Sequence, residues 1–505
     1  MLSHTQTGTT LGLEGIVVEV EVDVAERGFP TFTIVGLPSK AVDEAKDRVR
    51  TAITNTGYEM PDSRITVNLA PADIPKSGTS FDLALAIGIL AASQIVDLTG
   101  YEQSMIVGEL SLDGKVRKVP GILPLILLAK EKQMKVLFIP AENSVEASII
   151  DDIMVYPVSS LRQIVDHIKQ TTLIEALKPV PWEEKVLSKS DFDFANIRGQ
   201  EYTKRALEIA AAGFHNVHLQ GPPGAGKTLL SKSFPSILPP LEKDEMLEVA
   251  RIYSVIGQLT EDPFRGVRPY RSPHHTTSRV GLIGGGTNPM PGEISLAHRG
   301  VLFLDEFPEF PRSVLESLRQ PIEDGMVTVS RAAGSLTFPA RFILLAASNP
   351  CPCGFLGHPK KQCTCVPGNV TKYRKRLSGP ILDRIDLHLV VPPVDVEKLG
   401  KDFESETSQD IRTRVMQARG RQRVRFERSS IRFNSEMTSA NVKEYTQSAP
   451  EAIALLQQAV DKLSLSARTY FKMLKVAQTI ADLAGEPMIQ KQHVAEALQY
   501  RVKEA

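Results

Sequence analysis

The chain has 505 residues, too many for one ordinary hydrophobic core and enough for about three domains of typical size. Lysine plus arginine equals aspartate plus glutamate, at 59 each, so no overall charge draws the chain to nucleic acid or to an anionic membrane. Residues 1–13 lack the basic and then apolar build of a signal peptide, and the most apolar run, 122–129, is too short to span a bilayer. We therefore expect a cytoplasmic protein with no membrane contact.

The first 170 residues predict an α+β domain. Alternating valines and acids at 18–24 predict a strand, and a turn at 27–28 is expected to lead into a second strand at 31–35, so that a hairpin opens the protein. Further helices are predicted at 41–56, 81–92, 123–132 and 161–169, and further strands at 65–69, 105–110, 116–119, 136–139 and 153–156. The polar, proline-containing stretch 171–192 is expected to be a linker.

Two segments of this first domain, PKSGTS at 75–80 and GELSLDGKV at 108–116, resemble the signature segments of the Lon-protease catalytic domain. The fold class implied is that of the second domain of ribosomal protein S5. The resemblance places Ser80 at the nucleophile of Lon and Leu123 at its lysine base. A serine without a base is a poor nucleophile, so we expect a proteolytically inactive scaffold unless Lys118 or Lys130 replaces that base.

A phosphate-binding pattern, G-x-x-x-x-G-K-[ST], is matched at every fixed position by Gly221, Pro222, Pro223, Gly224, Ala225, Gly226, Lys227 and Thr228. The glycines let backbone N–H groups turn toward phosphate oxygens. Lys227 is expected to reach the β- and γ-phosphates of ATP, and Thr228 to bind Mg²⁺. A predicted strand at 216–220 before the pattern, and a helix after it, favour a P-loop over a glycine-rich turn that matches by chance.

Downstream, a continuous apolar run ends in Asp305 and Glu306, as expected of a buried parallel strand with acids at its C-terminal tip. Asp305 is expected to hold Mg²⁺ and Glu306 to polarise the attacking water. The alternative is that the two acids only cap the helix predicted at 311–323. The next apolar strand, 342–347, leads to Asn349, which is expected at the γ-phosphate and the lytic water or, alternatively, is a turn residue before proline.

Three further positions resemble functional positions of AAA+ ATPases. Gly199 and Gln200 precede a predicted helix at 201–212, where this superfamily carries a segment that contacts adenine; a connecting turn is the alternative. Arg384 resembles the arginine finger that acts across a subunit boundary, which implies a homo-oligomeric ring; a surface arginine paired with a neighbouring aspartate is the alternative. Arg468 matches the sensor-2 arginine or, alternatively, is an exposed residue in a first helical turn.

Two insertions point to one branch of this superfamily. Residues 281–292 predict a flexible, glycine-rich loop, and residues 327–338 predict a hairpin that turns at 333–334. They match the helix-2 insert and the pre-sensor-1 hairpin of the magnesium-chelatase and MCM-like branch. Together with SPHH at 272–275 and GEISLAH at 292–298, they resemble the ComM/YifB-type magnesium-chelatase-like AAA+ ATPases over nearly the whole chain. This resemblance implies a hexameric helicase that promotes branch migration of branched or single-stranded DNA in homologous recombination during natural transformation.

All four cysteines of the chain stand in one loop rich in glycine, proline and lysine: Cys351, Cys353, Cys363 and Cys365. Four thiolates suffice for the tetrahedral shell of a structural Zn²⁺. The C-x-C spacing is tighter than that of the usual zinc ribbon, so reduced cysteines without a metal are the alternative.

Two further groups of polar residues do not predict a specific site. The spacing of His274, His275 and His298 is irregular, so they are expected to be polar loop residues rather than metal ligands. Seven arginines between residues 412 and 428, offset only by Glu427, form a cationic stripe that either contacts DNA phosphates or is a solvated helix face.

The predicted fold class is α/β, with an α+β first domain, an ATPase domain and a helical lid. The predicted parts are a Lon-protease-like domain (1–170), the linker (171–192), a magnesium-chelatase-like AAA+ P-loop domain (193–400), and a basic helix with the lid (401–505), whose helices are predicted at 453–463, 467–483 and 491–501. Two other functions stay open, namely a chelatase motor that remodels a metal-insertion partner and an ATP-dependent protease. The chain has no domain rich in Asp-x-Ser-x-Ser to favour the first, and Leu123 disfavours the second.

Overall fold

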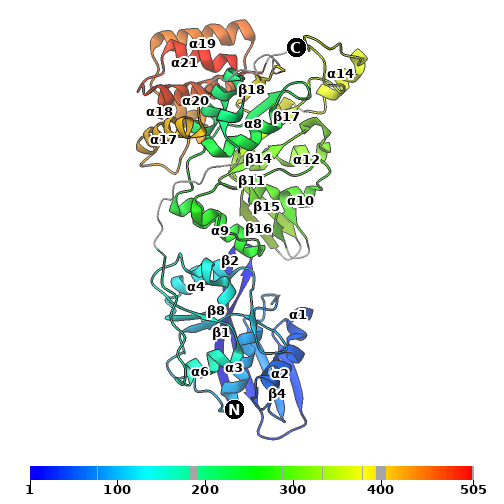
Figure 1. Cartoon of the computed structure of the whole chain (residues 1–505), viewed down its shortest axis with the longest axis vertical. Coiled ribbons are helices and arrows are strands. Elements are labelled where there is room, and N and C mark those ends of the chain that lie inside the picture. The colour runs from blue at the N-terminus through cyan, green and yellow to red at the C-terminus, as the bar shows by residue number, and fades with distance from the viewer. Residues whose placement is uncertain are drawn as a thin grey trace. The chain divides into compact units, whose positions relative to one another are not determined.

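The computed structural model describes residues 1–76, 78–180, 192–286, 289–331, 334–377, 379–393 and 405–502. The chain divides into two compact units, Met1–Glu183 with Met246–Phe264, and Glu184–Glu245 with Arg265–Ala505 (Figure 1). A segment from within the ATPase sequence, Met246–Phe264, thus belongs to the N-terminal unit. Within the described ranges, every helix is too short or too polar to cross a lipid bilayer. Half of the predicted linker, residues 181–191, lies outside these ranges.

The first sheet of the N-terminal unit contains, in spatial order, β1 (Leu2–Leu11), β2 (Glu14–Val24), β4 (Arg64–Ala70) and β3 (Thr31–Val35). The predicted opening hairpin is therefore wrong. Strand β2 pairs antiparallel with β1 and β4, whereas β3 runs parallel to β4 on its far side. The sequence pattern missed β1 because the buried side chains on its inner face are threonines, Thr5, Thr7 and Thr9, rather than apolar residues.

The remaining predicted elements of this unit are present, but the predicted helix 41–56 is divided into α1 and α2, the predicted strand 105–110 is divided between two sheets, and α5 was not predicted. Its helices are α1 (Lys40–Asp43), α2 (Ala45–Asn55), α3 (Asp82–Ala92), α4 (Ile122–Glu131), α5 (Ser144–Ala147) and α6 (Leu161–Ile168). A second, parallel sheet contains β5 (Ser104–Ile106), β8 (Val136–Pro140) and β9 (Met154–Val158), and β6 (Glu109–Leu110) pairs antiparallel with β7 (Val116–Arg117). Helix α3 is buried along almost its whole length, as its unbroken apolar sequence predicts.

The second unit is built on a parallel sheet with the spatial order β11 (Tyr270–Arg271), β14 (Val301–Leu304), β17 (Ile343–Ser348), β10 (Val217–Gln220) and β18 (Leu387–Val390). The carboxyl ends of parallel strands meet at one edge of a sheet. This edge therefore gathers the loops that follow β10, β14 and β17, which are the three loops predicted to carry the ATP site.

Both predicted insertions have regular structure in their described residues. The hairpin contains β15 (Met326–Arg331) and β16 (Gly334–Pro339), which pair antiparallel just before β17; Ala333, in its predicted turn, lies outside the described residues. The prediction of a flexible loop at 281–292 is wrong. These residues contain the end of α10 (Arg279–Ile283) and a short antiparallel pairing of β12 (Gly284–Gly285) with β13 (Met290–Pro291). Glycine allows this close pairing, since a Cβ on Gly292 would stand 2.3 Å from the nitrogen of Gly284.

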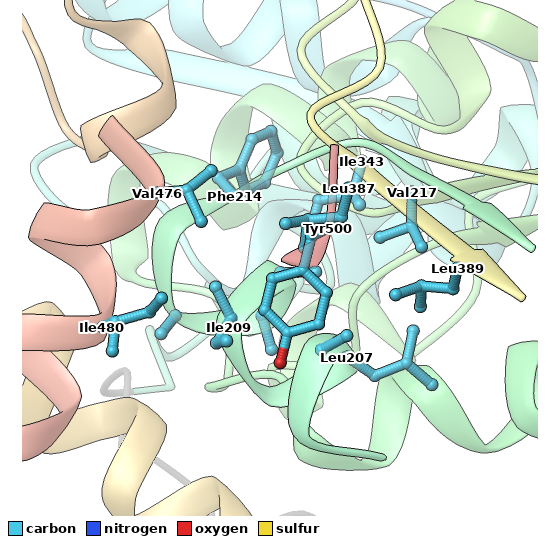
Figure 2. Packing of buried hydrophobic residues seen from close by; sticks show 14 of the residues in the cluster. Leu207, Ile209, Phe214, Val217, Ile343, Leu387, Leu389, Val476, Ile480 and Tyr500 are labelled. Atoms are coloured by element: carbon cyan, nitrogen blue, oxygen red, sulfur yellow. The ribbon is translucent and has the colours of Figure 1, made fainter. Parts of the chain in front are cut away.

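The lid and the sheet share one hydrophobic core (Figure 2). Leu207 and Ile209 on α7 (Glu201–Gly213), strand residues such as Leu387, and Val476 on α20 (Ala467–Ala484) all belong to it. The lid helices are α17 (Ser408–Arg425), α18 (Ser439–Tyr445), α19 (Pro450–Leu463), α20 (Ala467–Ala484) and α21 (Lys491–Gln499). The other helices of the unit are α7 (Glu201–Gly213), α8 (Lys227–Ser233), α11 (Glu293–Leu296), α12 (Arg312–Ser317), α13 (Arg319–Asp324), α14 (Pro367–Arg374) and α15 (Gly379–Leu382), and α9 (Lys243–Val255) crosses the boundary between the units.

Much of the arginine stripe on α17 contacts the chain itself. Five of its arginines bind groups of the chain; Arg425, 16% exposed, is packed within the unit, whereas Arg423, 73% exposed, lies on a solvated face, one of the two interpretations. Arg414 pairs with Glu208 and Glu406, Arg419 donates to the carbonyl of Ala211, Arg421 donates to the carbonyl of Asp482, Arg423 pairs with Glu242, and Arg425 pairs with the carboxylate of Asp482.

Candidate active site

The P-loop lysine lies where the loop, the helix after it and the neighbouring strand meet. Lys227 Nζ donates hydrogen bonds to the carbonyl oxygens of Gly221 at 2.6 Å and Pro222 at 3.0 Å, and to Oδ1 of Asn349 at 3.1 Å. Burial lowers the pKa of Lys227, and the nearby carboxylate of Asp305 opposes that shift. The structure therefore brings together the predicted lysine, sensor asparagine and strand-end acid.

The loop itself has the conformation that phosphate binding needs. Gly224 and Gly226 have φ angles of 78° and 86°, which only glycine adopts readily, and a Cβ at either would meet nothing within 4 Å. Helix α8 begins at Lys227, immediately after this turn. The loop thus presents an open face at a helix N-terminus, the arrangement that favours an anion.

The two predicted magnesium ligands are in direct contact. Thr228 Oγ1 donates a hydrogen bond of 3.0 Å to Oδ2 of Asp305, whose Oδ1 accepts a 2.9 Å bond from the backbone N–H of Glu306. Neighbouring ligands of an octahedral Mg²⁺ at about 2.1 Å stand about 3.0 Å apart. A hydroxyl and a carboxylate oxygen at this spacing fit that ion.

Glu306 is held by a partner that the sequence analysis missed. Its carboxylate Oε2 lies 3.1 Å from Nδ1 of His275. The spacing of His275 in the sequence predicts only a polar loop residue. The backbone of Glu306 is left-handed, with φ of 51°, an uncommon conformation for a residue other than glycine. His275 follows β11, the sheet neighbour of β14, so strand order and not sequence spacing brings the two residues together.

The predicted adenine-contacting segment lies beside the P-loop. Gln200 Nε2 donates a 2.7 Å hydrogen bond to the carbonyl of Pro392, and the preceding Val391 closes on Gly221, where a Cβ would stand 2.4 Å from the Val391 oxygen. Gly199 and Gln200 both have positive φ angles, of 66° and 64°, which turn the chain into α7. The residues after β18 therefore contact both the predicted adenine-contacting segment and the P-loop.

The four cysteines form one cluster. The sulfur atoms of Cys351, Cys353 and Cys363 lie 3.4 to 3.6 Å apart, and all four sulfurs lie within 4.8 Å of one another. The cysteines are free thiols. Four sulfurs at about 2.3 Å from a tetrahedral Zn²⁺ would stand about 3.8 Å apart, so the donor set and its spacing fit zinc.

This cysteine loop lies against the P-loop, a contact that the sequence analysis did not predict. Gly354, with φ of 82°, lies so close to Pro223 that a Cβ would stand 2.5 Å from the proline Cδ and 3.8 Å from Cγ of Asn349. The cluster therefore holds a loop that supports both the phosphate-binding turn and the sensor asparagine.

Arg384 and Arg468 share one partner, Glu323, away from the P-loop. Arg384 Nη2 lies 2.7 Å from Oε2 of Glu323, and Arg468 Nη2 lies 2.5 Å from Oε1 of the same carboxylate. All three residues line a cavity of about 800 Å³, and none of the residues that line it belongs to the P-loop. The described chain thus carries two groups of predicted site residues in two places.

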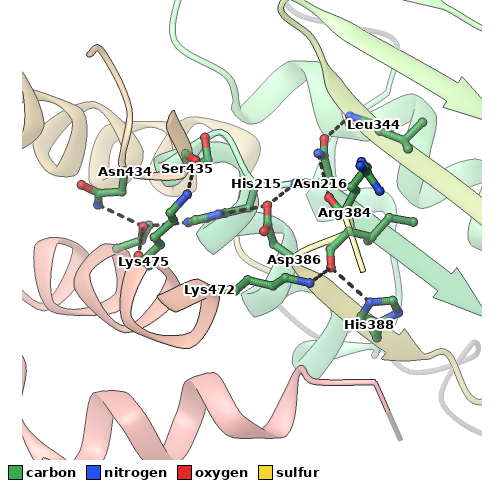
Figure 3. A network of polar contacts seen from close by, with 12 residues as sticks. His215, Asn216, Leu344, Arg384, Asp386, His388, Asn434, Ser435, Lys472 and Lys475 are labelled. Carbon is green, nitrogen blue, oxygen red and sulfur yellow. Dashed lines mark hydrogen bonds and ion pairs between the residues drawn. The ribbon is translucent and has the colours of Figure 1, made fainter. Parts of the chain in front are cut away.

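A polar network fixes the backbone around Arg384 (Figure 3). Asp386 accepts hydrogen bonds from the backbone N–H of Asn216 at 3.1 Å and from His215 at 3.4 Å, and the Asn216 side chain donates to the carbonyl of Arg384 at 3.3 Å. Burial raises the pKa of Asp386, but the bond from His215 and the nearby lysines, Lys472 among them, outweigh it and lower the pKa to about 2. The carboxylate is therefore charged and joins β10, β18 and α20.

Comparison with known sequences identifies the family. The family described as magnesium chelatase, subunit ChlI, matches residues 193–399, subunit ChlI of Mg-chelatase matches 20–143, and magnesium chelatase, subunit ChlI C-terminal, matches 405–501. Over 503 residues the chain is 42% identical to Competence protein ComM of Haemophilus influenzae, covering 99% of this chain and 97% of that protein. The chain belongs to the ComM/YifB-type magnesium-chelatase-like family.

Other relatives agree with this family. Uncharacterized protein YifB of Escherichia coli is 41% identical over 501 residues, 99% of this chain and 97% of that protein. Lon protease 2 of Bacillus subtilis is 29% identical over 171 residues, 30% of each chain. The relatives thus include both Lon-like and magnesium-chelatase-like proteins, and the position of a Lon-like domain in this chain stays a prediction.

The Lon-like serine has no lysine beside it in the contacts of the described residues. Ser80 Oγ lies 3.5 Å from the carbonyl oxygen of Gly8, and Leu123 is fully buried. Lys130, one of the two candidate replacement bases, pairs with Asp151 and Asp152 at 3.0 Å each. The proteolytic inactivity of this part of the ComM/YifB-type chain stays a prediction.

Proposed function

We propose that this protein is an ATPase that works as a motor on DNA. The observation that carries the ATPase proposal is the convergence of Lys227, Thr228, Asp305, Glu306 and Asn349 at one edge of the parallel sheet. Membership of a magnesium-chelatase-like family supports the same activity.

The proposed mechanism assigns a task to each of these side chains. Lys227 and the N–H groups of the loop bind the β- and γ-phosphates, and Asn349 holds the lysine and orients the lytic water. Mg²⁺, bound by Thr228 and Asp305, supplies positive charge to the phosphate oxygens. Glu306, held by His275, orients the water and draws off its proton. Gln200 and Gly199 are proposed to contact the adenine.

Arg384 and Arg468 are proposed to serve the ATP site of a neighbouring copy. Their common position at Glu323, in a cavity without P-loop residues, supports this assignment. An arginine that acts across a boundary requires a ring, and we propose a homohexamer. Each ATP would then lie between the P-loop of one copy and the two arginines of the next.

We propose branch migration of branched or single-stranded DNA during natural transformation as the work of this motor, in the cytoplasm. The similarity to Competence protein ComM supports it. The α10 to β13 segment and the β15–β16 hairpin are the proposed DNA-contacting insertions, since the central arginines of α17 bind the chain itself.

ATP turnover measured with and without single-stranded, duplex and four-way-junction DNA, alongside Glu306→Gln, tests this function. We expect DNA to stimulate turnover, and the wild type, but not Glu306→Gln, to resolve the junction. A wild type that hydrolyses ATP without stimulation and leaves every junction intact would refute the DNA motor and favour the second candidate. That candidate is a motor that remodels a metal-insertion partner, and the match to subunit ChlI supports it.

We also propose that the cysteine cluster binds a structural Zn²⁺. Three sulfur-to-sulfur distances of 3.4 to 3.6 Å support this assignment. Zinc content measured on the purified protein, with a Cys363→Ser variant for comparison, tests it. We expect about one zinc per wild-type chain, and a chain purified without zinc in wild type and variant alike would contradict the proposal.

A further inference from the structure

A single carboxylate holds both arginines of the proposed trans group. Glu323 lies near the C-terminal end of α13, Arg384 follows α15, and Arg468 is the second residue of α20, so three separate elements converge on it. Each carboxylate oxygen binds one guanidinium, at 2.7 Å and 2.5 Å. Burial raises the pKa of Glu323, but the two arginines outweigh it and lower the pKa below its ordinary value, so the bridge is ionised at neutral pH.

The other cations of this cavity have separate partners. Lys472 Nζ donates to the carbonyl of Ile385 at 2.8 Å, Lys475 Nζ donates to the carbonyl of Ser435 at 2.9 Å, and Arg341 pairs with Glu436 at 3.1 Å. Arg384 and Arg468 differ from them because both bind one carboxylate that is 41% exposed; Arg384 also donates a 2.6 Å hydrogen bond to the carbonyl oxygen of Pro380.

An exposed carboxylate between two guanidinium groups occupies the position that a phosphate would take between them. Carboxylate and phosphate oxygens accept the same charge-assisted hydrogen bonds from arginine. Because the side chain of Glu323 reaches solvent, it can turn away without unpacking the core, whereas Arg384, only 14% exposed, is fixed in place.

We propose that Glu323 is an intramolecular substitute for the γ-phosphate of a neighbouring copy's ATP, and that this phosphate must displace it from Arg384 and Arg468. The proposal rests on the proposed function, because it requires a ring with shared ATP sites. Before the ring assembles, Glu323 holds the two guanidinium groups at the spacing that the γ-phosphate later uses. After assembly, it competes with that phosphate, so it sets the ATP concentration at which the ring becomes active.

The test compares the full-length wild type with Glu323→Gln, Glu323→Ala and Asp324→Asn. Asp324 is the matched control, because it is the next acid along the chain and lines the same cavity. ATP turnover as a function of ATP concentration, and assembly followed by sedimentation with ATP and Mg²⁺, are measured for each protein. Removing the competing charge should lower the half-saturating ATP concentration about 3- to 10-fold in both Glu323 variants, while their maximal turnover stays at the wild-type value. Asp324→Asn should match the wild type in both quantities.

Each outcome decides whether Glu323 takes the place of the phosphate or only positions the two arginines. If Glu323 merely positions the arginines, its loss will lower maximal turnover or raise the half-saturating ATP concentration, and the proposal is overturned. Equal behaviour of Glu323→Gln and Asp324→Asn also overturns it. Arg384→Ala is the control for the proposed function: should this variant retain wild-type turnover and assembly, the shared ATP site itself is wrong, and that failure is separate from one confined to Glu323.

Discussion

At the scale of single residues, Lys227 is a ligand group held by its own loop. Its three hydrogen bonds go to two loop carbonyls and to Asn349, so its removal leaves no apolar cavity. We expect Lys227→Ala to abolish ATP binding, measured by calorimetry, while the far-ultraviolet circular dichroism stays unchanged. ATP affinity equal to that of the wild type would contradict the assignment of the P-loop lysine.

Gly354 tests whether the cysteine loop supports the P-loop. A methyl group there meets Pro223, whereas one at Gly357 meets nothing within 4 Å, although both glycines have positive φ, 82° and 77°. The two substitutions to alanine therefore carry similar backbone strain and differ in this contact. We expect Gly354→Ala to weaken ATP binding at least about tenfold more than Gly357→Ala, because a displacement of the loop moves the phosphate cradle.

Equal ATP affinities of these two variants, measured by titration calorimetry, would show that the contact with Pro223 has no part in binding.

At the scale of elements, the cysteine loop between β17 and α14 is expected to depend on the proposed Zn²⁺. It has little apolar core of its own, since Cys351 is buried while its other three cysteines are partly exposed. We expect Cys363→Ser, or removal of zinc with a chelator, to lower ATP turnover and to increase proteolytic cleavage between residues 351 and 365. The reduced, zinc-loaded wild type is the control, and restored turnover after zinc is added back completes the measurement.

The Asp386 network joins the lid to the sheet and gives the unit a defined pH dependence. The pKa of Asp386 lies at about 2 in the folded chain, below its ordinary value of 3.8. Its contribution to the free energy of unfolding, about 2 kcal/mol, is therefore complete above pH 3.8 and is lost as the pH falls from there toward 2. We expect Asp386→Asn to destabilise the protein at pH 7 and to differ less from the wild type at pH 3, measured by urea unfolding. A difference that does not depend on pH would exclude the charged carboxylate as its cause.

Some elements and site residues could be predicted from the sequence, and others could not. Lys227, Thr228 and Asp305 were predictable because phosphate chemistry fixes their types and spacing, and an unbroken apolar run marked the strand before Asp305. Thr5, Thr7 and Thr9 face inward in β1 without an apolar pattern, so the sequence showed neither the strand nor its pairing.

Contacts between distant segments could not be predicted from local pattern. Glu323 and His275 are ordinary polar residues by sequence, and only the fold brings Glu323 to Arg468 and His275 to Glu306. The arginines of α17 gave a misleading signal, because charge counts do not show which acids lie opposite them; Arg414 meets Glu208 across 206 positions of sequence. The predicted domain boundaries and the roles of the site residues stay predictions.

At the scale of the whole molecule, the N-terminal unit depends on a segment from the ATPase sequence. Ser254 Oγ donates a 2.7 Å hydrogen bond to the buried carboxylate of Glu146, and its carbonyl accepts a 2.8 Å bond from the backbone N–H of Gly121. We expect Ser254→Ala to destabilise this unit by about 1 to 3 kcal/mol, because it leaves Glu146 buried without one of its donors. Amide hydrogen exchange of α4 should then accelerate while that of α8 stays unchanged, and equal acceleration in both helices would contradict a local effect.

The membership of Met246–Phe264 in the N-terminal unit also affects how the protein is made. Because a chain emerges from the ribosome in order, residues 1–183 are synthesised well before the segment that completes their unit. At about 5 to 20 residues per second, residues 1–183 wait several seconds for segment 246–264, while the P-loop strand and helix are already being synthesised. The N-terminal unit therefore cannot reach its final structure before residue 264 has been synthesised, although all of its residues are made before the second unit, which extends to Ala505, is complete.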